Sequence, residues 1–357
     1  MNRSRTLHLS TLALAGALLL APLAAMADHI ADNMLLLQTA SGGWSKQYKG
    51  VAVDYTRTFT AAEIAELKQP GRKDDATIDN KATTYEITYL STAFKNEKNA
   101  TYLAAAKRGV DYLLKAQYAN GGWPQFYPDL SSYHHQITYN DDAMVRVLNL
   151  LQDIGEGKGD TGAQLRGSHG ARAQLRGSHG ARAQQAVTKG LECVLATQVK
   201  IGGTLTIWGA QYDEVTLKPA KARAYELASL SSSESVSIVR FLMRQPSPSA
   251  KIKTAVQAAA TWFDTHRMRD LATKKIDDPT QETGKDVILV AQPGASLWAR
   301  FYDLQNQRPL YANREGVALT DYMKVPNERR VGYAWHGTWP DKLLKEDVPK
   351  WRAANGL

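Results

Sequence analysis

The sequence feature that most restricts the fold is a weak repeat, Gln-x-x-x-Gly-Gly, placed just after an apolar helical segment. It occurs at residues 38–43, 117–122 and 198–203, and a Trp follows the first two copies. A Gly just past a helix is preferred because it adopts the left-handed cap conformation. A helix, a cap, a long loop and a further helix, repeated at a steady interval, are typical of helical hairpins arranged around an axis. The repeat therefore predicts a mainly α fold, an incomplete (α/α) toroid of helical hairpins with long irregular loops and a few short strands.

The spacing of apolar residues predicts where these elements lie. In residues 102–118, for example, Leu103, Ala106 and Val110 recur at the helical period. Strand signals are few, and the best short candidates are residues 204–208 and 287–290. The expected helices cover residues 30–38, 82–94, 102–118, 142–154, 186–198, 225–242, 250–267 and 297–304.

The N-terminal residues 1–27 have the form of a secretory signal peptide. Arg3 and Arg5 precede a short apolar run, and Ala25-Met26-Ala27 is a small-x-small cleavage site. The run is too short to span a membrane, and no later stretch is apolar enough to do so. We therefore expect an exported protein, secreted or periplasmic, with a signal peptide over residues 1–27 and a single domain over residues 28–357.

The charge balance and the cysteine content narrow the class of protein. The formal net charge is +9, which suits an acidic polysaccharide, an anionic membrane or a nucleic acid. The Lys and Arg residues are not gathered into one block, and this spread disfavours a nucleic-acid partner. Cys193 is the only cysteine, so no intramolecular disulfide can form and stability must come from a core. We expect a monomer with no nucleic-acid or membrane partner.

Residues 155–185 differ from the rest of the chain. The decapeptide AQLRGSHGAR occurs twice in tandem, at residues 163–172 and 173–182. An identical duplication that contains Gly and Ser and lacks an apolar period is typical of a tolerated surface insertion. The sequence therefore predicts a solvent-exposed insertion over residues 155–185.

Acidic and amide side chains gather where loops meet helices. Asn140-Asp141-Asp142 stands at the start of the helix expected over residues 142–154, and Asp79-Asn80 and Asp213-Glu214 stand at similar boundaries. Asn and Asp are preferred residues at a helix start, where they cap it and complement its dipole. The same oxygen ligands suit a hard cation such as Ca²⁺. The residues alone leave both interpretations open.

Several longer strings point to a known family. NGGWPQFYP, ITYNDDAM, WGAQYDE, ARAYELASLS and ERRxGYAWHG (residues 328–337) resemble the pectate lyases of polysaccharide lyase family ten. The resemblance covers residues 28–341 and implies an incomplete (α/α) toroid. It also implies endo-cleavage of polygalacturonate by Ca²⁺-assisted β-elimination, which gives 4,5-unsaturated oligogalacturonides. The tandem decapeptide departs from the family pattern and is expected to lie away from the site.

The resemblance also implies roles for individual residues. The base that removes the proton at C5 of a galacturonate would be Arg314, with Asp79 and Asp141 as the catalytic carboxylates. Calcium would be held by Asp79, Asp141 and Asp142. Ca²⁺ and arginines would offset the charge that develops beside the uronate carboxylate, and a crowded cationic site favours a neutral arginine. The residues expected to bind substrate are Asn80, Asp142, Tyr212, Arg223, Arg300 and Arg329.

Other interpretations remain. His134 or His135 is a conventional candidate for the base. The aromatic residues of the loops either stack on sugar rings or fill the core. The Gln-Trp pattern also resembles that of terpenoid-cyclase-like toroids, although export and the lack of a clear Asp-rich diphosphate motif argue against that class. A non-catalytic protein that binds acidic polysaccharides would use the same arginines.

Overall fold

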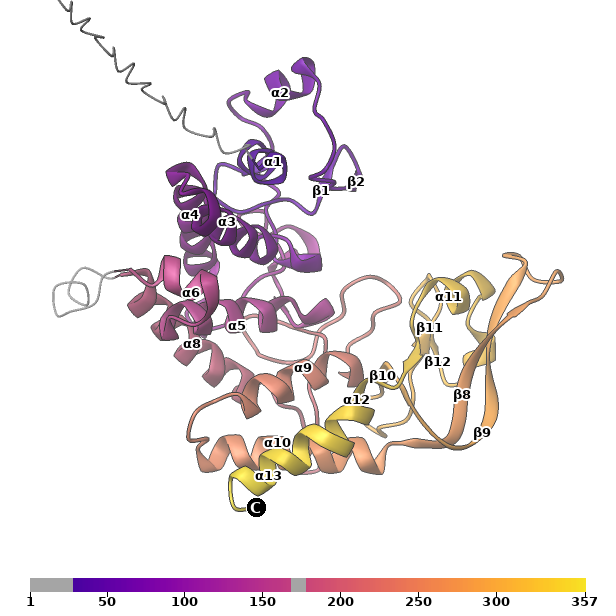
Figure 1. The fold of residues 1–357 in the computed structure, drawn as a ribbon. Coiled ribbons are helices and arrows are strands. Elements are labelled where there is room, and N and C mark those ends of the chain that lie inside the picture. Colours follow the sequence, from indigo (N-terminus) through magenta and orange to yellow (C-terminus); the bar gives the residue numbers. More distant parts are fainter. Residues whose placement is uncertain (1–27, 168–177) are drawn as a thin grey trace, which may run out of the picture.

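The computed structural model describes residues 28–167 and 178–357, and its helices form an open row. Successive helical hairpins pack side by side, from α1 at one end to α10 and α13 at the other (Figure 1). The three principal hairpins are α3 (Thr84–Glu97) with α4 (Ala100–Ala116), α5 (Ala143–Glu156) with α8 (His179–Ala196), and α9 (Ser232–Met243) with α10 (Ala250–Thr265). The predicted (α/α) toroid is therefore wrong, because the first and last hairpins lie at opposite ends of the row.

The C-terminal part of the chain departs further from a toroid. A long antiparallel hairpin, β8 (Met268–Asp277) with β9 (Lys285–Ala299), extends from the end of α10, and β13 (His336–Gly337) pairs with β9. The strand candidate at residues 287–290 lies inside β9. A second, smaller apolar cluster lies beside this sheet and contains Phe301, Leu310, Tyr311, Tyr322, Val325 and Trp335. The chain thus joins helical hairpins to a β-rich region.

The helix predicted over residues 297–304 is also wrong. This segment is the end of β9, followed by β10 (Phe301–Tyr302) and a turn. It has the same form as residues 208–219, where β6 (Gln211–Tyr212) precedes a similar turn. In each copy a tyrosine hydroxyl accepts a backbone N–H three residues earlier, Tyr212 from Gly209 (2.6 Å) and Tyr302 from Ala299 (3.1 Å). These side-chain bonds to the backbone fix a turn where apolar spacing alone favours a helix.

The remaining elements are short. Some two-residue strands form local hairpins, such as β4 with β5, and others join separate loops, such as β3 with β6 and β7 with β10. The short helices are α1 (His29–Leu37), α2 (Ala61–Leu67), α6 (Gly159–Leu165), α11 (Asn327–Gly332), α12 (Trp339–Lys342) and α13 (Val348–Ala354). The short strands are β1 (Gln47–Tyr48), β2 (Val51–Ala52), β3 (Ile137–Thr138), β4 (Lys200–Ile201), β5 (Thr204–Leu205), β7 (Leu230–Ser231), β11 (Tyr311–Ala312) and β12 (Ala318–Leu319). Among the described residues, no helix is both long and apolar enough to cross a membrane.

The glutamine of the repeat joins each hairpin to the next. Gln38 donates from its amide to the carbonyl of Ala105 on α4 (2.9 Å), and Gln117 donates in the same way to Ala186 on α8 (2.9 Å). Gln198 donates to Ala255 on α10 (3.0 Å). A buried amide that lost such a partner would cost about 1–3 kcal/mol. The repeat therefore fixes the spacing of successive hairpins.

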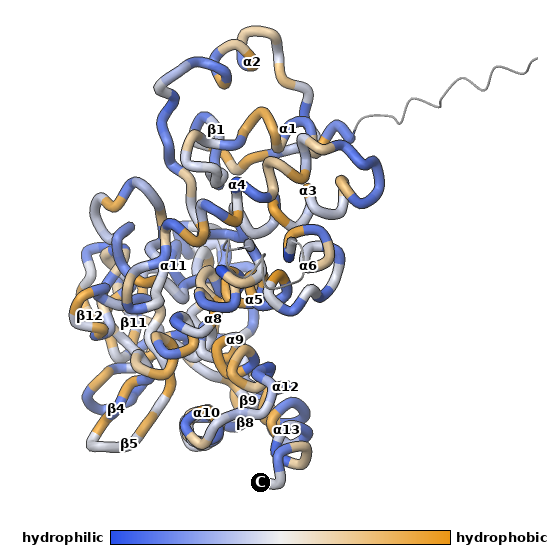
Figure 2. Tube along the Cα trace, turned by 90° about the vertical axis from the view of Figure 1, so that its left-hand side faces the viewer, coloured by the Kyte–Doolittle hydropathy of each residue, from blue (hydrophilic) through white to orange (hydrophobic). Residues whose placement is uncertain are grey.

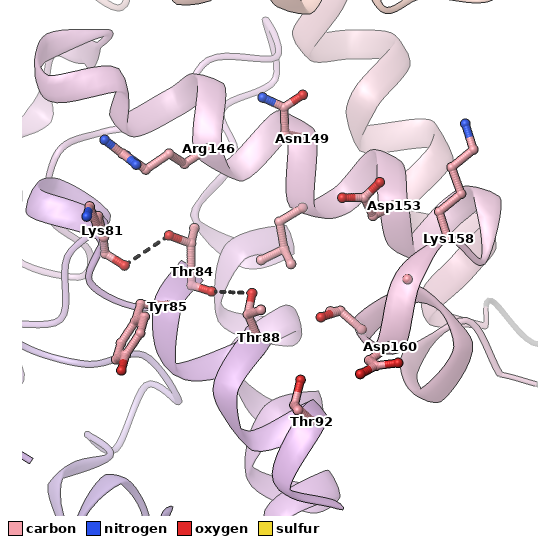
Figure 3. Close-up of a pocket in the computed structure, with 13 residues that line it drawn as sticks. Lys81, Thr84, Tyr85, Thr88, Thr92, Arg146, Asn149, Asp153, Lys158 and Asp160 are labelled. Carbon is pink, nitrogen blue, oxygen red and sulfur yellow. Dashed lines mark hydrogen bonds between the residues drawn. The ribbon is translucent and has the colours of Figure 1, made fainter. Parts of the chain in front are cut away.

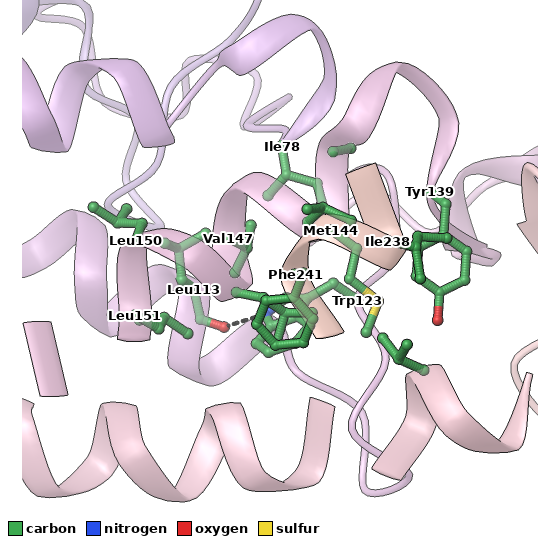
Figure 4. Packing of buried hydrophobic residues seen from close by; sticks show 14 of the residues in the cluster. Ile78, Leu113, Trp123, Tyr139, Met144, Val147, Leu150, Leu151, Ile238 and Phe241 are labelled. Carbon is green, nitrogen blue, oxygen red and sulfur yellow. Dashed lines mark hydrogen bonds between the residues drawn. The ribbon is translucent and has the colours of Figure 1, made fainter. Parts of the chain in front are cut away.

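A buried tryptophan lies after each of the three copies, and a fourth, Trp298, makes the same kind of bond. The indole of Trp123 donates to the carbonyl of Leu113 (2.7 Å), and the equivalent bonds run from Trp44 to Met34, from Trp208 to Val194 and from Trp298 to Phe263. Figure 4 shows Trp123 among apolar side chains of α5 and α9. Apolar residues are frequent along α9 (Figure 2). The same core cluster extends from Ala31 and Met34 of α1 to Val348 and Trp351 of α13, so the core runs along the whole row.

Much of the predicted insertion is helical in the part that the structure describes. Residues 168–177, which hold most of the duplicated decapeptide, lie outside the described residues. On either side the chain is helical, and Leu165 of α6 and Ala183 of α8 are fully buried. The prediction of an exposed loop over residues 155–185 is therefore wrong for these flanking helices, because their apolar side chains pack into the row.

We expect Gly121→Ala to destabilise the protein by about 3 kcal/mol or more. Gly121 has φ of 92°, and an added Cβ would lie 2.1 Å from the carbonyl oxygen of Lys189 on α8. Gly202, the equivalent residue of the third copy, has φ of 57° and no neighbour within 4 Å. Gly202→Ala is therefore the control, with a cost of about 1 kcal/mol. Urea unfolding measures both, and equal losses would contradict this account of the packing.

Candidate active site

The starts of three helices meet at a pocket of about 450 Å³. The turn before α3, the turn before α5 and the first turn of α9 all contribute side chains to it. Arg300 reaches it from the segment between β9 and β10. The lining residues are Asn80, Lys81, Asp141, Asp142, Arg146, Ser233, Glu234, Arg300 and Trp339. Helix starts carry a partial positive charge, which offsets part of the negative charge of the acidic side chains in this pocket.

Two of these helix starts are unusual turns with left-handed residues. Asn80 has φ of 49° in η1 (Asp79–Lys81), and Asp141 has φ of 50° in η3 (Asn140–Asp142). Asn and Asp tolerate this conformation better than most residues because their short polar side chains bond locally. The two turns lie against each other. The sequence thus places amide and carboxylate groups of two repeats in one pocket.

Arg300 and Glu234 form a buried ion pair at the floor of the pocket. Their side chains are only 11% and 1% exposed, and Arg300 also lies 3.4 Å from Asp141 Oδ1. Burial alone would lower the pKa of Arg300, but the charges of Glu234, Tyr333 and Asp141 raise it overall. Arg300 is therefore a fixed cation, and its Nε has no protein partner among the described residues. Glu234 is not among the site residues predicted from the sequence.

Asp79 is held differently from Asp141. Its carboxylate is buried and lies 2.5 Å from Lys46 Nζ, and it does not line the pocket that contains Asp141 and Asp142. In the part of the chain that the structure describes, no group of three His, Cys, Asp or Glu side chains could hold a metal ion. The structure thus brings Asp141 and Asp142 together in the pocket, whereas Asp79 lies outside it in an ion pair with Lys46.

Three arginines gather beside the pocket. Arg314 donates two hydrogen bonds to Glu328 (2.7 and 2.9 Å), and Arg329 donates to the same carboxylate (2.8 Å). Arg223 donates to Glu226 (2.9 Å). Arg223 and Arg329 both lie over the ring of Tyr225, at 5.0 and 5.2 Å. These glutamates and the tyrosine hold the arginines in a fixed cluster.

The arginine cluster is one aromatic layer away from the pocket. Tyr225 packs edge-on against Tyr333 (5.4 Å), and the guanidinium of Arg300 lies 5.2 Å from the Tyr333 ring. Arg314 is 57% exposed and does not line the pocket. Its hydrogen bond to Glu328 raises its pKa, which is the opposite of what a base requires.

The other sequence candidates occupy different surroundings. Tyr212, which the sequence predicted to bind substrate, is fully buried in the core, so its ring is not exposed at the surface. Its hydroxyl is fixed by Gly209, so it belongs to the core. His134 stacks on Phe126 (4.2 Å), and burial lowers its pKa. His135 Nδ1 lies 2.6 Å from Glu214. Neither histidine lines the pocket described above.

We expect Glu234→Ala to cost about 3–5 kcal/mol of stability, because it leaves Arg300 buried without its main counter-charge. The control is Glu346→Ala, which removes an exposed pair with Lys350 (3.8 Å) and is expected to cost less than about 1 kcal/mol. Chemical denaturation of both variants tests the difference. Similar midpoints for the two variants would show that the buried pair contributes no more than a surface pair.

The comparisons with known proteins agree with one another. A family model described as pectic acid lyase matches residues 38–344. A solved family 10 polysaccharide lyase from Cellvibrio cellulosa is 31% identical, with a TM-score of 0.74 over 92% of this chain and 91% of that chain. A mutant of the family 10 enzyme from the same organism, in complex with trigalacturonic acid, is 30% identical, with a TM-score of 0.74 over 92% of each chain. The search of curated proteins found no match.

The family match spans most of the chain, and the structural match covers nearly all of both chains. The family resemblance read from the sequence strings is thereby confirmed. The chain belongs to the pectic acid lyase family and is a pectate lyase of polysaccharide lyase family 10.

Proposed function

We propose that this pectate lyase is an exported enzyme that cleaves polygalacturonate endo-fashion with the help of Ca²⁺. Residues 1–27 would direct export, and residues 28–357 would form one catalytic domain that acts as a monomer. The observation that carries the proposal is the pocket at the helix starts, because it is lined by three cationic side chains, Arg300, Arg146 and Lys81. The bound trigalacturonic acid of the related Cellvibrio structure supports a uronate substrate.

The charge of the pocket supports a cation cofactor. Three cationic and three acidic side chains line it, namely Lys81, Arg146, Arg300, Asp141, Asp142 and Glu234. The formal charges of these side chains therefore cancel. A uronate carboxylate that entered without a cation would leave the pocket with a net negative charge. Asp141 and Asp142 are half-exposed oxygen donors of the kind that Ca²⁺ prefers. They are too few to form a complete site, so carboxylates of the polymer would supply further ligands.

When bound, Ca²⁺ would offset negative charge on the substrate carboxylate and so ease removal of the neighbouring C5 proton. The protein residues have separate tasks in this proposal. Arg300, held by Glu234, would orient a uronate carboxylate with its free donors. Arg223 and Arg329, fixed over Tyr225, would bind further carboxylates of the polymer. The side-chain amide of Asn80, which lines the pocket, would form a hydrogen bond with the substrate.

The base in this proposal is Arg314. It is exposed next to Arg329, whose positive charge favours a neutral neighbour. Glu328 opposes this by raising the pKa of Arg314. Proton removal therefore requires Arg314 to exchange its bond to Glu328 for a contact with the substrate. Because that exchange and deprotonation are easier at high pH, we expect an enzyme that favours alkaline conditions.

We expect the purified protein to release unsaturated product from polygalacturonate, seen as rising ultraviolet absorbance, with added Ca²⁺ and not with chelator. Asp141→Asn should raise the calcium concentration for half-maximal rate by about tenfold or more, because it removes an anionic ligand. Asp79→Asn should act in the same direction but less strongly, because Asp79 is paired with Lys46 and lies outside the pocket. Asp264→Asn, which alters a surface carboxylate paired with Arg267, is the control.

A rate that does not depend on calcium would overturn the cofactor proposal. An unchanged calcium requirement in both the Asp79 and Asp141 variants would remove these two residues as ligands. In that case Asp142 and Glu234 are the remaining carboxylates of the pocket to test.

We expect Arg314→Ala to lower kcat by about 10²–10⁴-fold, the range for loss of a general base, while polymer binding persists. Glu328→Gln provides an independent readout. It removes the anion that raises the pKa of Arg314, so a larger fraction of Arg314 is neutral at each pH. The alkaline rise of kcat/KM should therefore move to lower pH. Rate–pH profiles measure this shift.

Arg308→Ala, at an exposed arginine outside the cluster, is the matched control. Full activity of Arg314→Ala would reject it as the base. If Arg223→Ala instead abolishes turnover without weakening binding, the base is Arg223, and if neither change does so, His134 and His135 come next. An unshifted profile for Glu328→Gln would assign Arg314 to substrate binding alone.

A further inference from the structure

Lys81 lies where three pockets meet. It lines the active-site pocket, a second pocket of about 580 Å³ between α3, α5 and α6, and a third of about 790 Å³ beside β2 and α3. Of the described residues, only Lys81 lines all three. Figure 3 shows it near Arg146 at one end of the second pocket, with Asp153 and Lys158 toward the other. A polymer that extends from the active-site pocket toward either of the other two would therefore lie close to this side chain.

The ammonium group of Lys81 is available for a ligand. Several other cationic side chains line these pockets, and each of them forms an ion pair with a protein carboxylate, whereas Lys81 forms none with any described residue. The pairs are Lys46 with Asp79 (2.5 Å), Arg146 with Asp142 (3.6 Å), Lys158 with Glu156 (2.6 Å) and Arg300 with Glu234. An anion bound at Lys81 therefore does not have to displace an existing partner.

The backbone at Lys81 is strained. Its φ is 73°, in the left-handed region that favours Gly, and this conformation costs an L-residue about 1–2 kcal/mol. Thr84 donates a hydrogen bond from its hydroxyl to the Lys81 carbonyl (2.9 Å) and so helps to hold the turn (Figure 3). Strained residues that the surrounding structure maintains are often functional. Lys81 combines this backbone with a place on the wall of three pockets, which makes its side chain a candidate for a functional role.

We propose that Lys81 binds a carboxylate of the uronate polymer where the polymer leaves the active-site pocket, and that it thereby selects unesterified galacturonate. This inference rests on the uronate substrate of the proposed function. A lysine ammonium is a compact charge with three donors, and the start of α3 just beyond it adds positive potential. A methyl ester at that sugar has no charge to attract, so Lys81 favours the free acid.

The test compares Lys81→Gly, Lys81→Arg and the control Lys98→Gly. Lys98 also has a left-handed backbone (φ 61°), at the opposite end of α3, and lines none of the three pockets. Glycine suits both positions, so both glycine variants should fold with an unchanged or higher Tm. The measurement is the ratio of kcat/KM on polygalacturonate to kcat/KM on partially methyl-esterified pectin.

For Lys81→Gly we expect this ratio to fall about fivefold, because the strongest exposed ion pairs change an equilibrium by about that factor. The fall should come mainly from a higher KM on polygalacturonate. Lys98→Gly and Lys81→Arg should keep the wild-type ratio. An unchanged ratio in Lys81→Gly, or an equal fall in Lys98→Gly, would overturn the role of Lys81 and leave the proposed function standing. A wild-type protein that leaves polygalacturonate intact would instead overturn the proposed function.

Discussion

The bond from a glutamine amide to the next hairpin sets the geometry on which the rest of the structure depends. Gln38, Gln117 and Gln198 each stand at or just after the end of a helix and donate to a backbone carbonyl of the following hairpin. Successive hairpins therefore stack in the same orientation, and the starts of α3, α5 and α9 fall along one side of the row. That side carries the pocket. A local, repeated amide bond thus determines where distant polar side chains meet.

The sequence predicted the hairpins well because their signals are local. Apolar periodicity and the glycine caps located α3, α4, α5 and α10 closely. Whether the row closes into a ring depends on the angles between hairpins, which no local signal encodes. The polar strand β8 was also missed, because residues 268–277 lack the alternation expected of a half-buried strand. Its partner β9 contains the β-branched residues Val287, Ile288 and Val290, which gave a strand signal.

The candidate site was predictable where it follows a helix start. Asp141 and Asp142 were found by their position and by the family resemblance, and they line the pocket. Glu234 was missed because the sequence was read as a helix over residues 225–242, which places Glu234 in its middle. The helix α9 begins at Ser232, so Glu234 lies in its first turn. The Ser-x-x-Glu pattern from Ser231 was the available signal, since it is typical of a helix start.

Three arginines in and beside the pocket share one arrangement, in which a glutamate holds the guanidinium. Arg300 pairs with Glu234, Arg223 with Glu226, and Arg314 with Glu328. Such pairs orient a cation for a uronate carboxylate, but they also keep it protonated. Glu328 differs from the other two glutamates because it also accepts a hydrogen bond from Arg329. If Arg314 turns toward a substrate, Glu328 therefore keeps a cationic partner. The carboxylate of Glu328 is then not left unpaired, which would be costly. Of these three arginines, Arg314 is therefore the one that can change partners most easily.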